Sequence, residues 1–139
     1  MKIIALFGRG KCGKSETLGI YLRAIAYEKA NIINKKTIGK DTRECIVTSD
    51  ITIDICPPGD NEAIVLDNIS FFESNPFDIA YTATRCWGKG CEALDRYAKQ
   101  IGAELIWIKK PYNDELDEGG QSEANKTLAK ELFELCATK

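Results

Sequence analysis

The chain has 139 residues, of which 44% are hydrophobic and 29% are charged, and these are ordinary values for a globular domain. We expect one domain over residues 1–139, because this length supports one three-layer core but no second folding unit. The formal net charge of −2 gives no general attraction to nucleic acid, and no apolar run approaches the roughly eighteen residues of a membrane span.

The first predicted element is an apolar strand over residues 3–7 that runs directly into a glycine-rich loop. The loop has Gly8, four intervening residues, and then Gly13, Lys14 and Ser15, which is the spacing of a Walker A phosphate-binding loop. Glycines allow successive backbone N–H groups to point at one phosphate. A helix that starts at Ser15 would turn its free N–H groups towards the same anion.

This motif resembles the phosphate loop of the P-loop NTPase superfamily, which implies nucleotide phosphate binding on a parallel sheet but names no reaction. The resemblance implies that Lys14 acts on the β- and γ-phosphates as a catalytic residue and that the Ser15 hydroxyl binds Mg²⁺. A glycine-rich turn without a ligand is the structural alternative. The predicted nucleotide-binding residues are Gly8, Arg9, Gly10, Lys11, Cys12, Gly13, Lys14, Ser15 and Glu16.

A locally basic segment, residues 29–43, follows the helix predicted over residues 15–30. Its lysines include Lys35, Lys36 and Lys40. Two interpretations stay open: the segment binds a small phosphate-bearing acceptor, or it is a solvated surface loop.

Residues 45–56 predict two short strands joined by a turn at Ser49 and Asp50. In the second strand three isoleucines face one way and Asp54 faces the other. Asp54 is the candidate for the carboxylate that, with Ser15, holds Mg²⁺. The alternative is an exposed residue on an edge strand.

A stiff turn of two prolines and a glycine comes next and leads to Asp60. This aspartate suits the N-cap of a helix that ends near residues 74–76. A catalytic role is the alternative, in which the carboxylate positions water or an acceptor hydroxyl near the γ-phosphate.

An apolar run at residues 77–84 predicts an interior parallel strand, and Arg85 follows it. Because ligands collect at the carboxyl ends of strands in open α/β sheets, Arg85 should lie on the same edge as the phosphate loop. There it could neutralise the charge that develops during phosphoryl transfer. The alternative is a surface ion-pair partner.

The remaining pattern predicts a helix over residues 91–100, a strand over 104–110, an acidic loop over 109–120 and a helix from residue 121 or 122 to 136. We therefore expect an α/β three-layer sandwich around a mostly parallel sheet of about five strands, with the topology of a P-loop NTPase.

The chain has no histidine, which excludes Ser-His, Cys-His and His-metal mechanisms. We expect its six cysteines to be free thiols and the protein to be cytoplasmic. The Asn-Lys-x-Asp motif of GTPases is absent after the last strand, which favours ATP over GTP as the ligand, together with Mg²⁺. Hydrolysis of the γ-phosphate, its transfer to a small acceptor, and a nucleotide-dependent switch without fast hydrolysis stay open, as does the oligomeric state.

Overall fold

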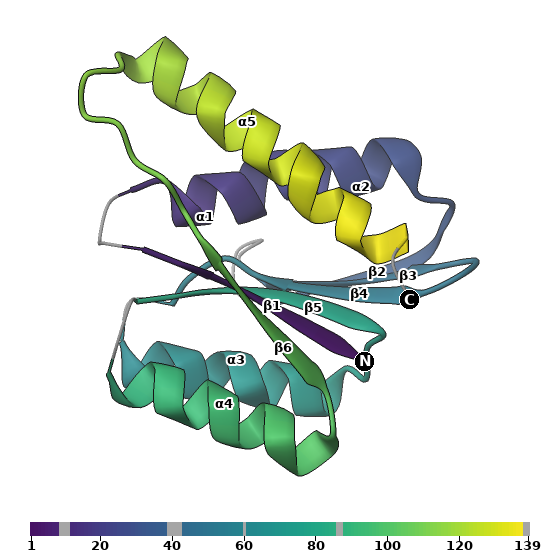
Figure 1. Cartoon of the computed structure of the whole chain (residues 1–139). Coiled ribbons are helices and arrows are strands. Elements are labelled where there is room, and N and C mark those ends of the chain that lie inside the picture. The colour runs from purple at the N-terminus through teal and green to yellow at the C-terminus, as the bar shows by residue number, and fades with distance from the viewer. Residues whose placement is uncertain (9–11, 39–42, 60, 86–87, 138–139) are drawn as a thin grey trace.

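The computed structural model of the chain describes residues 1–8, 12–38, 43–59, 61–85 and 88–137. In these ranges the chain forms a six-stranded sheet between two layers of helices (Figure 1). The strands are β1 (Lys2–Phe7), β2 (Ile32–Ile38), β3 (Arg43–Thr48), β4 (Thr52–Cys56), β5 (Ile79–Thr84) and β6 (Glu104–Lys109). The helices are α1 (Lys14–Glu16), α2 (Arg23–Lys29), α3 (Glu62–Ser74), α4 (Lys89–Ile101) and α5 (Glu118–Glu134), with a π-helical stretch (Thr17–Leu22) between α1 and α2 and a 3₁₀ turn (Leu135–Ala137) after α5.

The strand order is β2-β3-β4-β5-β1-β6, which places β1 in the interior between β5 and β6. The pairs β4–β5, β5–β1 and β1–β6 are parallel, whereas β2–β3 and β3–β4 are antiparallel. The predicted α/β class is confirmed, as is the hairpin that β3 and β4 form. The sheet itself is mixed and six-stranded, instead of mostly parallel with about five strands.

The additional strand is β2, which falls in the basic segment that the sequence presents as a loop or an acceptor-binding region. From Ile33 to Ile38 its side chains are exposed, so it lacks the alternation of buried and exposed residues that indicates a strand. It is an edge strand held by antiparallel pairing with β3. Exposed lysines on such an edge also discourage pairing with another chain.

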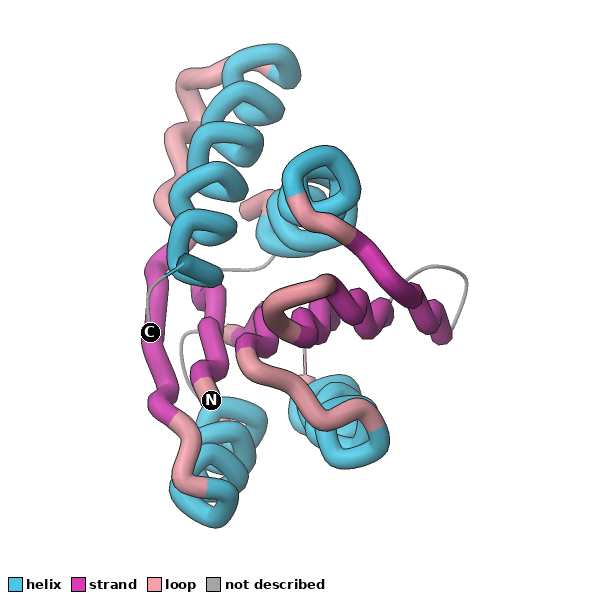
Figure 2. The backbone as a smooth tube through the Cα atoms, turned by 90° about the vertical axis from the view of Figure 1, so that its right-hand side faces the viewer, coloured by secondary structure: helices cyan, strands magenta, loops and turns pink. Residues whose placement is uncertain are grey.

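The helices cover opposite faces of the sheet, with α1, α2 and α5 on one face and α3 and α4 on the other (Figures 1 and 2). Each face has its own hydrophobic core. The first contains Leu18, Leu22, Ile25, Ala26, Ile53, Ile55, Leu128 and Leu132, and the second contains Cys45, Cys56, Val65, Ile69, Phe72, Leu94, Tyr97 and Ala98. Side-chain alternation along β4 therefore decides which layer each of its residues enters.

Two helices begin at asparagine and aspartate caps. The N-cap of α3 is Asn61, whose side chain accepts a hydrogen bond from the Ile64 N–H at 2.9 Å, while the predicted cap, Asp60, lies outside the described residues. The Asp117 carboxylate accepts from the Gly120 N–H at 2.7 Å and caps α5. This cap starts α5 at Glu118, so the prediction of a start at residue 121 or 122 was wrong.

Candidate functional site

The predicted phosphate loop lies at the carboxyl end of an interior strand, β1, and leads into α1. Gly8, the residue after β1, is buried, and Cys12 is only 2% exposed. Arg9, Gly10 and Lys11 lie outside the described residues. The described ends of the loop therefore have the strand-to-helix placement that a phosphate cradle needs.

Gly13 and Lys14 give the end of the loop its shape. Gly13, the residue before α1, has a left-handed backbone with φ 95° and ψ 16°, which glycine adopts at little cost. Lys14 is 5% exposed, and its Nζ donates a hydrogen bond to the Gly8 carbonyl at 2.6 Å. The lysine side chain therefore folds back across the loop and holds its charge beside the start of α1.

The turn after β4, residues 57–59, contacts both the start of α1 and the end of the neighbouring strand β5. The Ser15 hydroxyl donates to the Pro57 carbonyl at 3.2 Å. A Cβ atom at Gly59 would lie 1.8 Å from the Ala83 carbonyl oxygen, so the turn packs its bare backbone against the end of β5. The turn thus connects Ser15 to the carboxyl ends of two further strands, β4 and β5.

Asp54, the predicted magnesium ligand, lies within β4 and is fully buried. Its neighbours Ile53 and Ile55 enter the core beneath α2 and α5, so Asp54 faces the opposite layer, beneath α3 and α4. Ser15 lies in α1, on the other face of the sheet (Figure 1). The structure therefore does not bring Asp54 and Ser15 together, and the alternative of an exposed edge position is wrong as well.

Both carboxylate oxygens of Asp54 are buried without a hydrogen-bond partner among the described residues. Burial raises the pKa of this carboxyl from 3.8 to about 7, against a smaller lowering by the Cys45 thiol opposite it in the β3–β4 pair. Burial and Asp54 together raise the pKa of Cys45 to about 12. This interior carboxyl is thus poised to stay protonated below neutral pH.

Arg85 follows β5 on the predicted edge of the sheet, since Phe7 of β1 and Thr84 of β5 are paired in register. Its side chain is exposed and borders a cavity of about 340 Å³ at the starts of α3 and α4. This cavity is lined by Gly59, Asn61, Glu62, Val65, Thr84, Arg85, Gly88, Lys89, Gly90 and Cys91. Arg85 therefore shares the edge with the loop but lies in a neighbouring pocket; the other predicted catalytic residue, Asp60, is outside the described residues.

Two residues that the sequence did not single out, Lys110 and Asn125, complete the described surroundings of the loop. Each is 3% exposed. Asn125 of α5 donates from Nδ2 to the Glu16 carboxylate. A Cβ atom at Gly13 would lie 2.8 Å from this amide nitrogen. The Asn125 Oδ1 is buried without a partner among the described residues. The position of Lys110 directly after β6 could have indicated it, whereas nothing in the sequence links Asn125 to Glu16.

A second cavity, of about 590 Å³, opens beside Glu16 on the side of α5. Its lining comes from the end of α1, the loop after β6 and the first turns of α5, and includes Tyr112, Leu116 and Gln121. It reaches the described residues of the candidate loop at Glu16 and therefore adjoins the described end of that loop.

Lys35 and Lys36 of the basic segment lie far from this site. Lys35 and Lys36 are on β2, four positions from β1 in the strand order, which is roughly 19 Å at the usual strand spacing. The Lys35 Nζ lies 4.3 Å from the centre of the Tyr27 ring, and Lys40 is outside the described residues. The structure therefore does not bring Lys35 or Lys36 to the phosphate loop.

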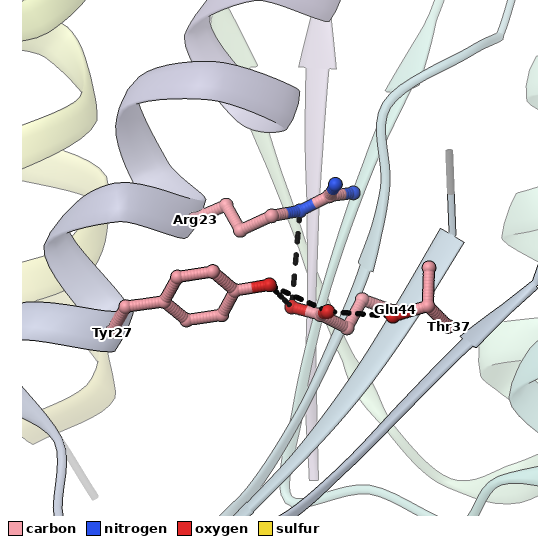
Figure 3. Close-up of polar contacts among 4 residues, drawn as sticks. All are labelled: Arg23, Tyr27, Thr37 and Glu44. Atoms are coloured by element: carbon pink, nitrogen blue, oxygen red, sulfur yellow. Dashed lines mark hydrogen bonds and ion pairs between the residues drawn. The ribbon is translucent and has the colours of Figure 1, made fainter. Parts of the chain in front are cut away.

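Next to Tyr27, the structure has a polar cluster that the sequence did not indicate (Figure 3). Glu44 of β3 accepts hydrogen bonds from the Tyr27 hydroxyl at 2.5 and 2.6 Å and from the Thr37 hydroxyl at 2.7 Å. Arg23 Nε lies 3.8 Å from the same carboxylate. The cluster connects α2 with β2 and β3, so its role is to hold the edge of the sheet.

Comparisons of the chain with protein-family models, with curated proteins and with solved structures found no match. Within the described ranges, no helix combines the length and the apolar character that a membrane crossing needs. In the same ranges no three His, Cys, Asp or Glu side chains form a group that could hold a metal ion. The interpretation of the site rests on its own geometry.

Proposed function

We propose that the chain binds a nucleoside triphosphate, with ATP preferred, through the loop between β1 and α1. The observation that carries this proposal is the position of Lys14, buried and folded back onto the Gly8 carbonyl at 2.6 Å, directly after a left-handed Gly13. The lysine ammonium and the start of α1 then lie beside the same loop, and both are groups that favour phosphate oxygens. We also propose that the sheet around this loop is of the P-loop NTPase-like type.

The reaction that we propose is hydrolysis of the γ-phosphate or its transfer to a small acceptor. Lys14 would hold the phosphates, and Arg85 would approach the transferring group from the end of β5. The Ser15 hydroxyl suits a magnesium ion bound mainly by phosphate and water, because it lies at the helix start and is already oriented by the Pro57 carbonyl at 3.2 Å. Bound Mg²⁺ would neutralise phosphate charge.

A second candidate function is a nucleotide-dependent switch that hydrolyses slowly or not at all. The position of Asp54 favours it, because the predicted magnesium carboxylate lies on the other face of the sheet from Ser15. We therefore leave Asp54 out of the proposed metal site. The two candidates share the ligand and differ in turnover.

Nucleotide binding is tested by thermal unfolding and calorimetry with Mg²⁺ and, separately, ATP, ADP, GTP and GDP. A ligand at a hundred times its dissociation constant adds about 2.7 kcal/mol to the free energy of unfolding, so wild type should show a clear shift with ATP. Lys14→Ala should weaken binding by about 100-fold, because it removes a charged hydrogen-bond donor. The matched control is Lys29→Ala at the exposed end of α2. Wild type without any shift, or Lys14→Ala with wild-type affinity, would contradict the proposal.

Arg85→Ala separates the two candidate functions. If Arg85 acts on the transition state, turnover should fall by about 100-fold or more while nucleotide affinity changes little. Steady-state phosphate release and calorimetry measure the two effects on the same preparation. Equal losses of turnover and affinity would exclude the transition-state role, and wild type with binding but no measurable turnover would favour the switch.

A further inference from the structure

Lys110 is a buried lysine fixed against the phosphate loop. It follows β6, and its backbone N–H donates to the Phe7 carbonyl at 2.7 Å. At 3% exposed it is slightly more buried than Lys14, which is 5% exposed. A Cβ atom at Gly8 would lie 3.4 Å from both the Lys110 Cβ and the Lys110 carbonyl oxygen. Lys110 therefore approaches the loop from the β6 side and lies in contact with its first glycine.

The charge of Lys110 is poorly compensated within the protein. Its Nζ donates to the carbonyl of the next residue, Pro111, at 2.7 Å, and among the described residues it forms no ion pair. The nearby Glu16 carboxylate accepts a hydrogen bond from Asn125. Burial lowers the pKa of Lys110, while Cys12 and Glu16 raise it by smaller amounts. A buried ammonium of this kind is costly unless an anion joins it.

We propose that Lys110 is a second phosphate-binding lysine, which contacts the polyphosphate of the ligand from the β6 side of the loop and acts together with Lys14. This inference rests on the proposed function. It assigns a site in which two lysines, one after β1 and one after β6, share a polyphosphate. It also explains why the chain keeps a lysine at a position where an apolar side chain would fill the same space without a desolvated charge.

The test compares Lys110→Met with the matched control Lys109→Met. The two lysines are adjacent, but Lys109 is exposed, and methionine keeps most of the length of the side chain. The probes are inorganic tripolyphosphate and Mg²⁺-ATP, both measured by calorimetry. We expect Lys110→Met to weaken binding of both probes by about 10- to 100-fold, Lys109→Met to leave it nearly unchanged, and Lys110→Arg to recover part of the loss.

A proton-linked measurement distinguishes contact with the ligand from a structural role. Phosphate beside the ammonium raises the pKa of Lys110, so at alkaline pH wild type should take up protons when it binds tripolyphosphate. Calorimetry in two buffers of different ionisation enthalpy measures this uptake, which should be smaller in Lys110→Met. If Lys110→Met does not fold, Lys110→Gln and Lys110→Arg provide the same comparison.

The outcomes separate this inference from the proposed function. In one outcome Lys14→Ala loses binding, while Lys110→Met keeps the affinity and the proton uptake of wild type. This outcome would overturn the role of Lys110 and leave the nucleotide-binding proposal intact. Equal weakening in Lys109→Met would overturn it too, because a general charge effect would then suffice. Wild type that binds neither probe would overturn both proposals.

Discussion

Glu44 and Asp54 are buried carboxyl groups on neighbouring strands with opposite surroundings. Glu44, on β3, is 2% exposed and accepts hydrogen bonds from Tyr27 and Thr37, with Arg23 Nε at 3.8 Å. Asp54, on β4, is fully buried, and neither of its oxygens has a partner among the described residues. They face different helical layers, because the Glu44 contacts come from α2, whereas Asp54 lies on the side of α3 and α4.

This contrast shows that burial alone does not define what a carboxyl group does. Glu44 accepts hydrogen bonds from two hydroxyl groups and lies beside an arginine, so it connects three elements of the fold. Asp54 has no hydroxyl or arginine partner among the described residues, and burial, opposed only weakly by the Cys45 thiol, raises its pKa to about 7. We expect Glu44 to stabilise the fold through its contacts with Tyr27, Thr37 and Arg23, and Asp54 to destabilise the fold when it is charged.

The largest expected effect is that of Glu44→Ala. Removal of one partner from a buried ionic cluster typically costs about 3–5 kcal/mol, because the remaining groups lose their partner without regaining full hydration. Urea denaturation at pH 7 measures the loss. Glu28→Ala, an exposed glutamate on α2, is the control and should change stability by less than about 0.5 kcal/mol. A similar loss in both variants would show that the cluster has no special role.

Asp54→Asn should stabilise the fold at alkaline pH, whereas Glu44→Ala destabilises it. The folded protein holds the Asp54 proton up to about pH 7 whereas the unfolded chain releases it near pH 3.8, so the stability that this proton gives is complete below pH 3.8 and is lost as pH rises through about 7. Relative to wild type, Asp54→Asn should be nearly neutral at pH 4 and stabilising at pH 8, by at most about 4 kcal/mol.

Thermal unfolding from pH 4 to 8 tests this prediction, with Asp67→Asn as the control on the exposed face of α3. The other titratable groups that act with Asp54 are Cys45, Cys56 and Tyr97. Burial raises the pKa of all three, so they stay protonated over this range. A difference between wild type and Asp54→Asn that does not vary with pH would show that Asp54 is ionised throughout.

The same contrast explains what the sequence could and could not predict. Alternation along β4 placed Asp54 opposite the isoleucines, and this was right. It could not tell whether that face was open to a metal ion or closed by α3 and α4, because this depends on how distant elements pack. The α/β class, the β3–β4 hairpin and the strand before the phosphate loop were predictable for a different reason, since each has a local pattern.

Features that depend on distant contacts were missed. The residues of β2 show no strand alternation, and the Thr37–Glu44 bond that helps to hold this strand crosses to β3. Asn125 reaches Glu16 across 109 positions of the chain. The motif therefore indicated where the candidate site lies, while the positions of Lys110 and Asn125 beside it became visible only once β6 and α5 were placed beside β1 and α1.

The smallest expected effect is that of Tyr27→Phe. This variant removes one hydrogen-bond donor from Glu44 and so measures what a single donor contributes to the stability of the cluster. Tyr27 is 40% exposed, so water can replace part of its hydrogen bond, and we expect a loss of about 1 kcal/mol. The phenylalanine ring keeps the face on which Lys35 lies. Tyr21→Phe is the matched control, because the Tyr21 hydroxyl has no hydrogen bond among the described residues. In a Glu44→Ala background Tyr27→Phe should cost almost nothing; a full loss there would mean that the hydroxyl stabilises the fold without Glu44.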